Sequence, residues 1–556
     1  MTETTAEATA EPPVTDMRTV VVASSAGTAF EWYDFFVFGT LAAVMGRNFF
    51  SQLNETAGVL AALALFGAGF FFRPVGALIF GGLGDRVGRK SAFLITVTLM
   101  GVATFAIGLL PTYAQAGPIA PILLIIMRII QGTALGGEWG GAAIYVAEHA
   151  PADKRGANVA WIQTSAAFGL LGALGVIYIT RTTMGEAAFT SDGWLAGWRI
   201  PFLFSAGLLA ISIFMRLKLS ESPSFQKLKA SGETTKTPYR EAFGQWKNLK
   251  VVLMVLFAFM SAQGAAWYTV FFYSQVFLER FLKVAPTTTN LLIMAITVAS
   301  APLYIFFATL SDRVGRKWVM WGGMTLCCLF YFPGFHMLAN LANPGLVEAQ
   351  RRTPVVVVAD PATCHLQFDL IGKARFVTSC DIAKAALSNA GISYTNEAAP
   401  PGSLAQVRIG SQLVASAEGS GLSAPAFAAL KSSVETRIRA ALTTAGYPAT
   451  ADPARVNFWG LFGVMMIFVV GATALYGPMA AALVELFPTR IRYTALSLPY
   501  HIGTGWIGGF VPVTAFAIVT ATGNIYAGLW YSVFFTAISV VCCLFFLPET
   551  RGQPID

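Results

Sequence analysis

The sequence predicts an all-α polytopic membrane protein with twelve transmembrane helices and a small α+β insertion on the outer side of the membrane. Of the 556 residues, 55% are hydrophobic and 12% are charged, whereas soluble domains carry about 25% charged residues. Long apolar stretches recur along the chain, and one charged loop motif occurs twice. This composition excludes an ordinary soluble enzyme, a disordered protein and a nucleic-acid-binding protein.

Twelve apolar stretches are long enough to cross a hydrocarbon core of about 30 Å as helices. Ahead of them, residues 1–18 hold several acidic residues and a single Arg, so they form a tail rather than a secretory signal. We expect the spans at residues 19–46, 57–82, 91–112, 120–147, 157–180, 198–218, 251–279, 289–310, 318–340, 457–484, 494–519 and 525–547.

Lysine and arginine predict the orientation of these spans, because cytoplasmic loops carry an excess of both. With the N-terminus inside, the inner segments hold far more Lys and Arg than the short outer loops. The sequence therefore predicts a multi-pass protein of the cell inner (plasma) membrane with both termini in the cytoplasm. Its expected parts are an N-terminal tail at 1–18, a first helical half at 19–218, a central cytoplasmic loop at 219–250, a second half at 251–340 and 457–548, and a C-terminal tail at 549–556.

The charged loop motif marks an internal repeat. Residues 81–90 read GGLGDRVGRK and follow the second span, while residues 308–317 read ATLSDRVGRK and follow the eighth span. Internal repeats are common in secondary transporters. A weaker echo pairs Glu148 with Glu485 at an offset about 110 residues larger, so the second half must contain an insertion of that size.

The inserted residues form the one polar stretch of that length, 343–456. Because nine crossings from an inside N-terminus end outside, this stretch is expected on the outer face. Cys364 and Cys380 would then face an oxidising compartment, where a disulfide would close a loop of about 17 residues; two free or buried thiols are the alternative. Strand-like and helix-like runs predict a small α+β domain, with strands at 355–358, 365–368 and 406–409 and helices at 381–389 and 426–443.

Two carboxyl groups lie near the middle of the first span. Glu31 and Asp34 are three residues apart and share a helix face. Intramembrane charges are costly and usually face the bundle interior or a water-filled path, so we expect proton coupling here, with Asp34 as the proton-binding carboxylate; a structural ion pair or a capped polar kink is the alternative. Arg128 lies at a similar depth in the fourth span and is predicted to pair with Asp34 or to anchor a substrate carboxylate.

Further polar and amphipathic side chains within the spans are candidates for a substrate cavity. Arg73 could line such a cavity or reach toward the inner interface. The aromatic residues could equally serve as packing, and a lone His is more often a satisfied buried group. The candidates are Arg73, Gln131, Gln163, Gln263, Trp267, Tyr268, Tyr273, Tyr476 and His501.

The repeated loops predict a cytoplasmic gate. An Asp near a helix N-terminus is favoured by the helix dipole, while the Arg residues of the loop can reach acidic groups on neighbouring helices. Plain positive-inside anchors would explain the charge but not the duplicated Asp and Gly. The expected gate residues are Asp85, Arg86, Gly88, Arg89, Asp312, Arg313, Gly315, Arg316, Glu148 and Glu485.

A stripe of small residues runs along the fourth span. Gly132, Gly136 and Gly140 recur at four-residue spacing, which lets helices approach closely. Glu138 lies among them and could bind a second proton or accept hydrogen bonds from the loop motif; the structural role is favoured.

These motifs together resemble the major facilitator superfamily. The paired DRVGRK loops are similar to its signature, and the Arg128-x-x-Gln131-Gly132 pattern is similar to its second motif. Four narrower motifs resemble the metabolite:proton symporters, the group of shikimate, α-ketoglutarate and proline/betaine carriers: EWYDFF at 31–36, RP at 73–74, GGEWGG at 136–141 and WRIPF at 198–202.

The resemblance covers nearly all of the chain except 343–456. It implies two six-helix bundles, a central cavity, alternating access and proton-driven uptake. Ala308 replaces the first Gly of the second loop motif, which is expected to weaken close helix packing there.

The sequence thus predicts a proton-coupled importer of a small metabolite, and two intramembrane arginines favour an organic acid. The alternatives are a proton antiporter that exports metabolites, an osmosensing zwitterion symporter, and a transporter-like receptor that uses 343–456 as its sensor. The expected partners are the substrate, protons, the lipid bilayer and an unknown partner of the insertion. The sequence contains no metal-ligand cluster, Walker motif or catalytic constellation, so neither enzymatic activity nor a cofactor is expected.

Overall fold

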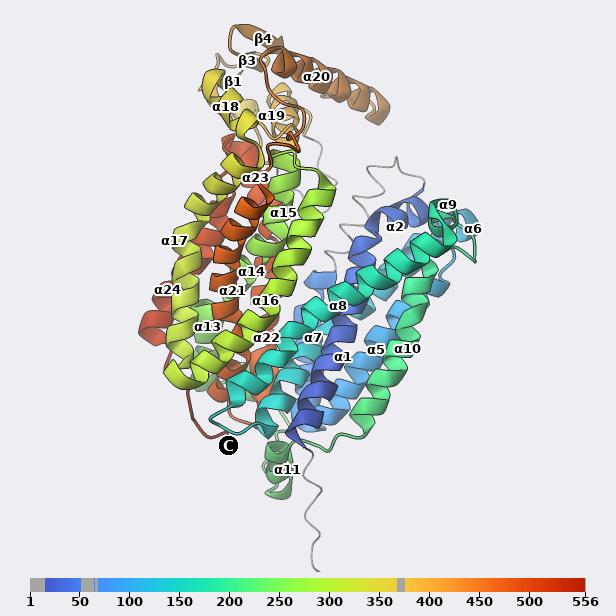
Figure 1. Cartoon of the computed structure of the whole chain (residues 1–556), viewed down its shortest axis with the longest axis vertical. Helices are drawn as coiled ribbons and strands as arrows, with labels where there is room; N and C mark the ends of the chain where they lie inside the picture. The colour runs from blue at the N-terminus through green and yellow to red at the C-terminus, as the bar shows by residue number, and fades with distance from the viewer. Residues whose placement is uncertain (1–15, 52–64, 66–68, 368–375, 556) are drawn as a thin grey trace, which may run out of the picture.

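The computed structural model describes residues 16–51, 65, 69–367 and 376–555. Its long helices form two groups, which lie side by side and follow each other along the chain (Figure 1). The first group contains α1 (Met17–Thr40), α2 (Ala42–Phe49), α4 (Arg73–Arg86), α5 (Arg89–Leu109), α6 (Tyr113–Ala116), α7 (Ile119–His149), α8 (Arg155–Met184), α9 (Glu186–Thr190) and α10 (Arg199–Leu217).

Three short helical segments connect the groups: α11 (Pro223–Ala230), α12 (Pro238–Phe243) and the first turns of α13 (Trp246–Val255). The second group continues with η1 (Leu256–Met260), α14 (Ser261–Tyr268), η2 (Thr269–Tyr273), α15 (Ser274–Val276), η3 (Phe277–Phe281), α16 (Pro286–Val314), α17 (Arg316–Ala342), α21 (Phe458–Leu486), α22 (Arg492–His501), η5 (Ile502–Gly508), α23 (Val511–Thr522) and α24 (Leu529–Phe546).

Ten helices in the described part of the chain are long and apolar enough to cross a membrane. The first predicted span corresponds to α1, whose Arg18, Glu31 and Asp34 make it more polar than the ten. The second predicted span, 57–82, falls partly outside the described residues, and its described end is α4. Several helices extend slightly beyond their predicted spans, as α7 does with 31 residues. A helix can continue beyond its apolar stretch when the polar residues of its end turns form hydrogen bonds or ion pairs.

The seventh predicted span is one continuous helical run from Trp246 to Phe281. It contains three π-helical segments, η1, η2 and η3, and the eleventh contains a fourth, η5. A π turn adds a residue to the repeat and rotates the side chains that follow, and such turns are frequent at functional sites. The aromatic residues of α14 and η2 therefore face more than one side of this helix.

The insertion folds as an α+β domain with a four-stranded sheet in the order β2-β1-β3-β4. The central strand β1 pairs with β2 in parallel and with β3 antiparallel, and β3 pairs with β4 antiparallel. The elements are α18 (Pro344–Arg352), β1 (Val355–Ala359), η4 (Pro361–Thr363), α19 (Ser379–Asn389), β2 (Tyr394–Ala398), β3 (Gln406–Ile409), β4 (Gln412–Ala415) and α20 (Ala424–Thr444).

One predicted strand of the insertion is wrong. Residues 365–367 are irregular, and residue 368 lies outside the described part. The segment binds α19 through side chains instead of pairing in the sheet, because the backbone N–H and the ring of His365 both contact the carboxylate of Asp381. The sequence also missed α18, β2 and β4, which are nine, five and four residues long.

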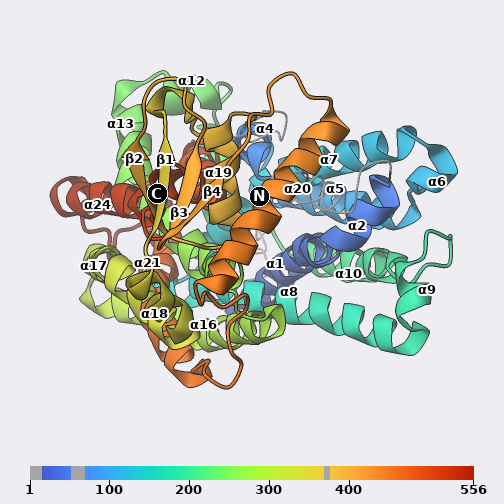
Figure 2. The ribbon, with the colours of Figure 1, turned by 90° about the horizontal axis from the view of Figure 1, so that it is seen from above.

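The insertion lies at the end of the second group opposite the loop motifs (Figure 1). Its strand β2 contacts the end of α23: the backbone N–H of Tyr394 donates to Gly523 O at 2.7 Å, and Asn396 Nδ2 donates to Thr522 O at 3.1 Å. It also binds the loop after η3, since Lys283 Nζ donates to Asn389 O at 2.8 Å. Seen from above, α20 extends from the sheet over the region between the two groups (Figure 2).

Candidate functional site

A cavity of about 670 Å³ lies between the two helical groups. Apolar side chains, about half of them aromatic, make up most of its wall, with contributions from α1 and α8 of the first group and from α14, η2 and α16 of the second. Its polar groups are neutral amides and hydroxyls, and none of the described lining residues is charged. The aromatic lining residues are Phe36, Phe70, Trp267, Tyr268, Phe271, Phe272 and Tyr304, and the amide-bearing ones are Gln163, Gln275 and Asn290.

Three of the predicted cavity residues, Gln163, Trp267 and Tyr268, line this cavity. The other six predictions differ from the structure, since these side chains lie behind the wall. Arg73 is buried beneath it, with its guanidinium 4.3 Å from the ring of Phe70 and 5.4 Å from that of Phe35. It therefore neither lines the cavity nor reaches toward an interface.

The remaining five predicted residues pack within or between the helical groups. Gln131 is bound inside the first group, and Gln263 is buried on α14. Tyr273 packs against Phe335. From the sequence, all five side chains resembled cavity residues, because a polar atom within a span indicates a buried face. The sequence does not tell whether that face lines the cavity or packs against another helix. Tyr476 bonds the Tyr500 hydroxyl, and His501 lies edge-on to the ring of Tyr500.

A second, much smaller cavity holds the intramembrane carboxyl groups. Glu31 and Asp34 of α1 and Glu138 of α7 all line a space of about 20 Å³ inside the first group, together with residues of α5 and α10. The three residues are 7%, 5% and 1% exposed. Burial of several carboxyl groups in one small space is costly unless protons or cations compensate them, so this cluster can bind protons.

Arg216 supplies the one ion pair of this cluster among the described residues. Its Nη2 lies 2.9 Å from Glu138 Oε1, and both side chains are 1% exposed. The sequence did not identify Arg216, because an Arg at the end of a predicted span reads as an interfacial anchor. Glu138 therefore pairs with Arg216 and does not accept hydrogen bonds from the loop motif.

The predicted pair of Asp34 and Arg128 is wrong in this structure. Arg128 lies over the ring of Phe38, at 4.1 Å, one helical turn beyond Asp34. Its Nη1 donates to Gln131 Oε1 at 2.8 Å, and Gln131 donates to the Thr104 hydroxyl at 2.7 Å. The Thr104 hydroxyl in turn donates to Met100 O at 3.0 Å. Arg128 is therefore bound to the amide of Gln131 and not to Asp34.

The first loop motif binds the second helical group. The carboxylate of Asp85 accepts the backbone N–H of Tyr493 at 3.2 Å and that of Thr494 at 2.8 Å, at the start of α22. Arg89 contacts Asp85 at 2.8 Å. Arg492 lies 2.6 Å from Glu148. We call this set, Asp85, Arg89, Glu148 and Arg492, the first latch.

The second loop motif forms the same arrangement in the opposite direction. Asp312 accepts the backbone N–H groups of Gly156 at 3.0 Å and Ala157 at 2.8 Å, at the start of α8. Arg316 contacts Asp312 at 2.5 Å and Glu485 at 3.2 Å, and Arg155 lies 2.8 Å from Glu485. The second latch is thus Asp312, Arg316, Glu485 and Arg155, and the two latches close one end of the molecule.

Arg155 and Arg492 belong to the latches, although the sequence analysis counted them only within the inner excess of Lys and Arg. A signal was present, because the two arginines repeat at the same offset as Glu148 and Glu485. The predicted gate residue Arg86 instead lies over the Tyr239 ring at 5.7 Å. Arg313 is exposed at the end of α16.

The turn of each loop motif requires glycine. Gly88 and Gly315 have φ values of 128° and 119°, in the region that glycine adopts readily. A Cβ at either position would also lie within 2.4 Å of a carboxylate oxygen, of Glu221 or of Glu549. These carboxylates accept the backbone N–H groups of Arg89 and Arg316, so each caps the helix that follows the motif.

The small residues of α7 permit close helix contacts, as their spacing indicates. A Cβ at Gly132 or Gly136 would lie 2.3 or 2.1 Å from a backbone oxygen preceding or within α4, and one at Gly140 would lie 2.6 Å from Ser497 Oγ. The expected weakening at Ala308 is not seen. The residue that faces Ala308 is Gly156, and a Cβ added there would lie 2.8 Å from Ala308 O. The glycine that permits this close contact is therefore on α8 instead of α16.

A peripheral ion pair adds to the closed end. Arg490 Nε lies 2.7 Å from Glu241 Oε2 of α12, with the arginine 46% exposed. Although burial alone would raise it, hydrogen bonds from Thr235 and from the Arg490 guanidinium hold the pKa of Glu241 below its usual value.

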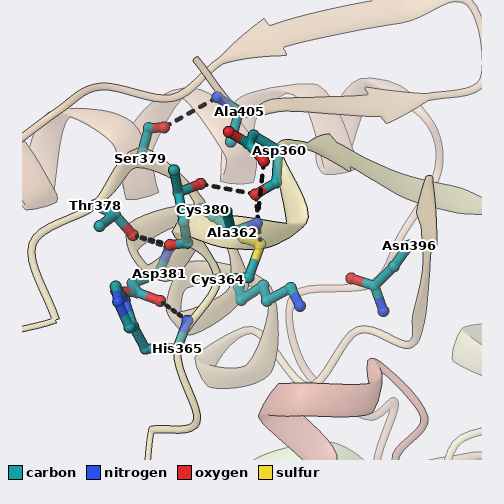
Figure 3. The surroundings of a disulfide bond; sticks show 12 residues. Asp360, Ala362, Cys364, His365, Thr378, Ser379, Cys380, Asp381, Asn396 and Ala405 are labelled. Atoms are coloured by element: carbon teal, nitrogen blue, oxygen red, sulfur yellow. Dashed lines mark hydrogen bonds and ion pairs between the residues drawn. A yellow bond between two sulfur atoms is a disulfide. The ribbon is translucent and has the colours of Figure 1, made fainter. Parts of the chain in front are cut away.

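The insertion contains a disulfide between Cys364 and Cys380, the pair named from the sequence. Figure 3 shows that the bond joins the loop after η4 to the first turn of α19. Asp360 lies beside it and accepts the backbone N–H groups of Gly402 and Ala362, which hold the pKa of Asp360 below its usual value. The disulfide and these bonds hold the irregular loop against the domain.

Comparison with protein families gives a match to the model described as "Sugar (and other) transporter", over residues 19–238, 224–349 and 438–556. The matches leave out most of the insertion. The chain is 36% identical over 346 residues to the inner membrane metabolite transport protein YhjE of Escherichia coli, covering 61% of this chain and 76% of that protein.

Two further relatives are the proline/betaine transporter and the shikimate transporter of Escherichia coli, at 35% and 36% identity over 60% of this chain and 67% and 79% of theirs. Among solved structures, a double-tryptophan mutant of XylE matches with a TM-score of 0.62 at 15% identity over 97% of both chains. The proton:xylose symporter XylE bound to 6-bromo-6-deoxy-D-glucose matches with a TM-score of 0.56 at 17% identity over 97% of both chains. At these identities the structures show a shared fold.

Proposed function

Because this chain belongs to the sugar (and other) transporter family, whose relatives described above are transporters and not enzymes, we propose that it is a proton-coupled symporter that imports a small metabolite by alternating access. It acts as a multi-pass inner-membrane protein with twelve spans and no cofactor. The observation that carries the proposal is the cluster of Glu31, Asp34 and Glu138, buried in the half that the two latches join to its partner.

The latches give this proposal its conformational cycle. The excess of Lys and Arg near the loop motifs places the latched end in the cytoplasm. The latches then keep the cavity closed toward the cytoplasm, and their opening releases substrate inward. Each latch bonds one half to a helix N-terminus of the other, so both must break in the same step.

The lining of the cavity refines the substrate class. Neither Arg73 nor Arg128 reaches it among the described lining residues, so the argument from arginines for an organic acid weakens. The amide of Gln163, whose Nε2 has no hydrogen-bond partner among the described residues, still offers a donor for the carboxylate of a small metabolite. A second candidate is a zwitterion with an ammonium group, because aromatic faces bind such cations. The relatives that transport proline/betaine and shikimate represent the two chemistries.

Uptake into proteoliposomes tests the proposal. The purified full chain is reconstituted and offered shikimate, 2-oxoglutarate, proline and glycine betaine, with and without a proton gradient directed inward. We expect accumulation of at least one compound that requires the gradient and is abolished by a protonophore. Gradient-driven loss of preloaded compound would indicate an antiporter instead, and no gradient effect on any compound would refute proton coupling.

A further inference from the structure

We propose that Arg216 is a positioning residue of the proton-coupling cluster, which pairs with Glu138 while Glu31 holds a proton and turns to Glu31 when that proton leaves. This inference rests on the proposed function and names a residue and a step that the function alone does not require. In this step the proton leaves the Glu31 carboxyl and is taken up by Glu138, while the ion pair of Arg216 passes from Glu138 to Glu31.

The position of Arg216 supports such an exchange. A Cβ added at Gly27 would lie 2.2 Å from Arg216 Nη2, so the guanidinium lies directly against α1, one turn before Glu31. Its Nε and Nη1 are buried and have no hydrogen-bond partner among the described residues, although Nη2 binds Glu138. Two donors are therefore unused beside the helix that carries the second carboxyl group.

The acceptor side is equally incomplete. Glu31 Oε2, Asp34 Oδ1 and Glu138 Oε2 are buried without a hydrogen-bond partner in the described part of the chain. All three residues line the same small cavity, which leaves room for little more than one water molecule. The Arg216 guanidinium contacts both Glu138 and Gly27 of the helix that carries Glu31. A turn toward α1 would therefore bring it to Glu31 in place of Glu138, and a proton must then satisfy the carboxylate that it leaves.

The charged and titratable groups that surround the cluster come from five elements. Glu31 interacts electrostatically with Glu138 of α7, Arg73 of α4, Arg216 of α10 and Asp34 of its own helix. Arg216 also faces Tyr493 of α22. Arg73 lies against the rings of Phe35 and Phe70, and Arg216 lies 3.8 Å over the ring of Phe93. Of these two cations, Arg216 is the one that pairs with a carboxylate of the cluster in the described part of the chain, so it is the cation placed to change partner.

The exchange also reaches the first latch. Tyr493 donates its hydroxyl to Gly137 O at 2.5 Å, next to Glu138, while its backbone N–H donates to Asp85. A proton that arrives at Glu138 and displaces Arg216 therefore changes the charge close to Tyr493, whose backbone the first latch binds. Protonation within the first half can thereby influence whether the latched end opens.

The experiment titrates the buried carboxyl groups of the purified full chain by infrared difference spectroscopy, with protons as the only ligand. The carboxyl C=O band lost in the E31Q variant gives the midpoint pH of Glu31. We expect E138Q to lower this midpoint by about one pH unit or more, because Arg216 then pairs with Glu31 permanently, and R216Q to raise it by a similar amount. The double variant E138Q/R216Q should return the midpoint close to that of the unchanged protein.

A glycine pair provides the matched control. G27A pushes the guanidinium away from α1 and should raise the midpoint, whereas G207A, on the same helix as Arg216 and with no atom within 4 Å of the added Cβ, should leave it unchanged. Thermal unfolding identifies variants that fail to fold. If E138Q or R216Q fails to fold, the midpoint pH of Glu31 in E138Q/R216Q and in G27A still tests the proposal.

If E138Q and R216Q shift the midpoint pH of Glu31 in the same direction, or do not shift it, the proposed role of Arg216 is overturned. In that case the unchanged protein would still show proteoliposome uptake that follows the proton gradient. Loss of gradient-driven uptake in the unchanged protein would instead overturn the proposed function.

Discussion

The two latches predict that removing one charge opens the closed end. Asp85 and Asp312 each accept two backbone N–H groups at the start of a helix in the other half. Hydrogen bonds to a charged group contribute about 1.5–3 kcal/mol each, and an anion at a helix N-terminus contributes about 0.3–1 kcal/mol more. An Asn keeps one acceptor oxygen without the charge, so Asp85→Asn should cost the latched state about 2–3 kcal/mol.

At about 1.4 kcal/mol per factor of ten, this loss shifts the balance between latched and open states by about 30- to 150-fold. Asp312→Asn should act to a similar extent, since its contacts match. Spin labels at Val87 and Val314, which are 55% and 54% exposed at corresponding places in the two halves, report the separation of the halves by pulsed electron resonance. We expect a longer distance to become dominant in both variants.

The control is Glu241→Gln at the same end. Its partly exposed pair with Arg490 should contribute about 0–1 kcal/mol, so the distance distribution should change little. If Asp85→Asn and Asp312→Asn leave the distribution unchanged, or if Glu241→Gln shifts it as much, then the backbone-capping carboxylates do not hold the halves together and our account of closure is wrong.

Three further predictions concern other parts of the molecule. Asp34→Asn should abolish accumulation driven by a proton gradient while leaving substrate exchange measurable in proteoliposomes; full gradient-driven uptake would exclude Asp34. Arg128→Lys should impair uptake nearly as much as Arg128→Ala, because Lys cannot reproduce the geometry that holds Gln131; rescue by Lys would mean that only the charge matters. Gly88→Ala should lower the unfolding temperature by several degrees, because a Cβ there meets the capping carboxylate of Glu221 at a strained φ; Gly207→Ala, in open space, should not.

The sequence predicted the features that depend on periodicity and on repetition. Apolar length located the spans, and the duplicated loop motif located Asp85 and Asp312 at corresponding sites. Depth was harder to predict, because counting residues along two apolar stretches does not tell how their helices are tilted and shifted relative to each other. Arg128 therefore meets Phe38 and not Asp34, a difference of one turn.

Arginines near helix ends were functional residues that the sequence analysis missed. Arg155, Arg216 and Arg492 were counted only among the inner Lys and Arg that predict the orientation, yet all three are buried and paired. A long side chain at a helix end can reach outward to the interface or inward to a carboxylate, and the sequence alone does not decide between them. The partner that decides lies on another helix, far along the chain.

The contacts of the insertion have a consequence for biogenesis. Strand β2 is bound at its outer edge by Gly523 and by the last turn of α23, which are synthesised more than a hundred residues after it. In the proposed topology, the domain crosses the membrane and its edge stays unpaired until the eleventh span is inserted. An open strand edge is a site for wrong pairing, so the period between the ninth and eleventh insertions is when the nascent chain is most vulnerable to aggregation.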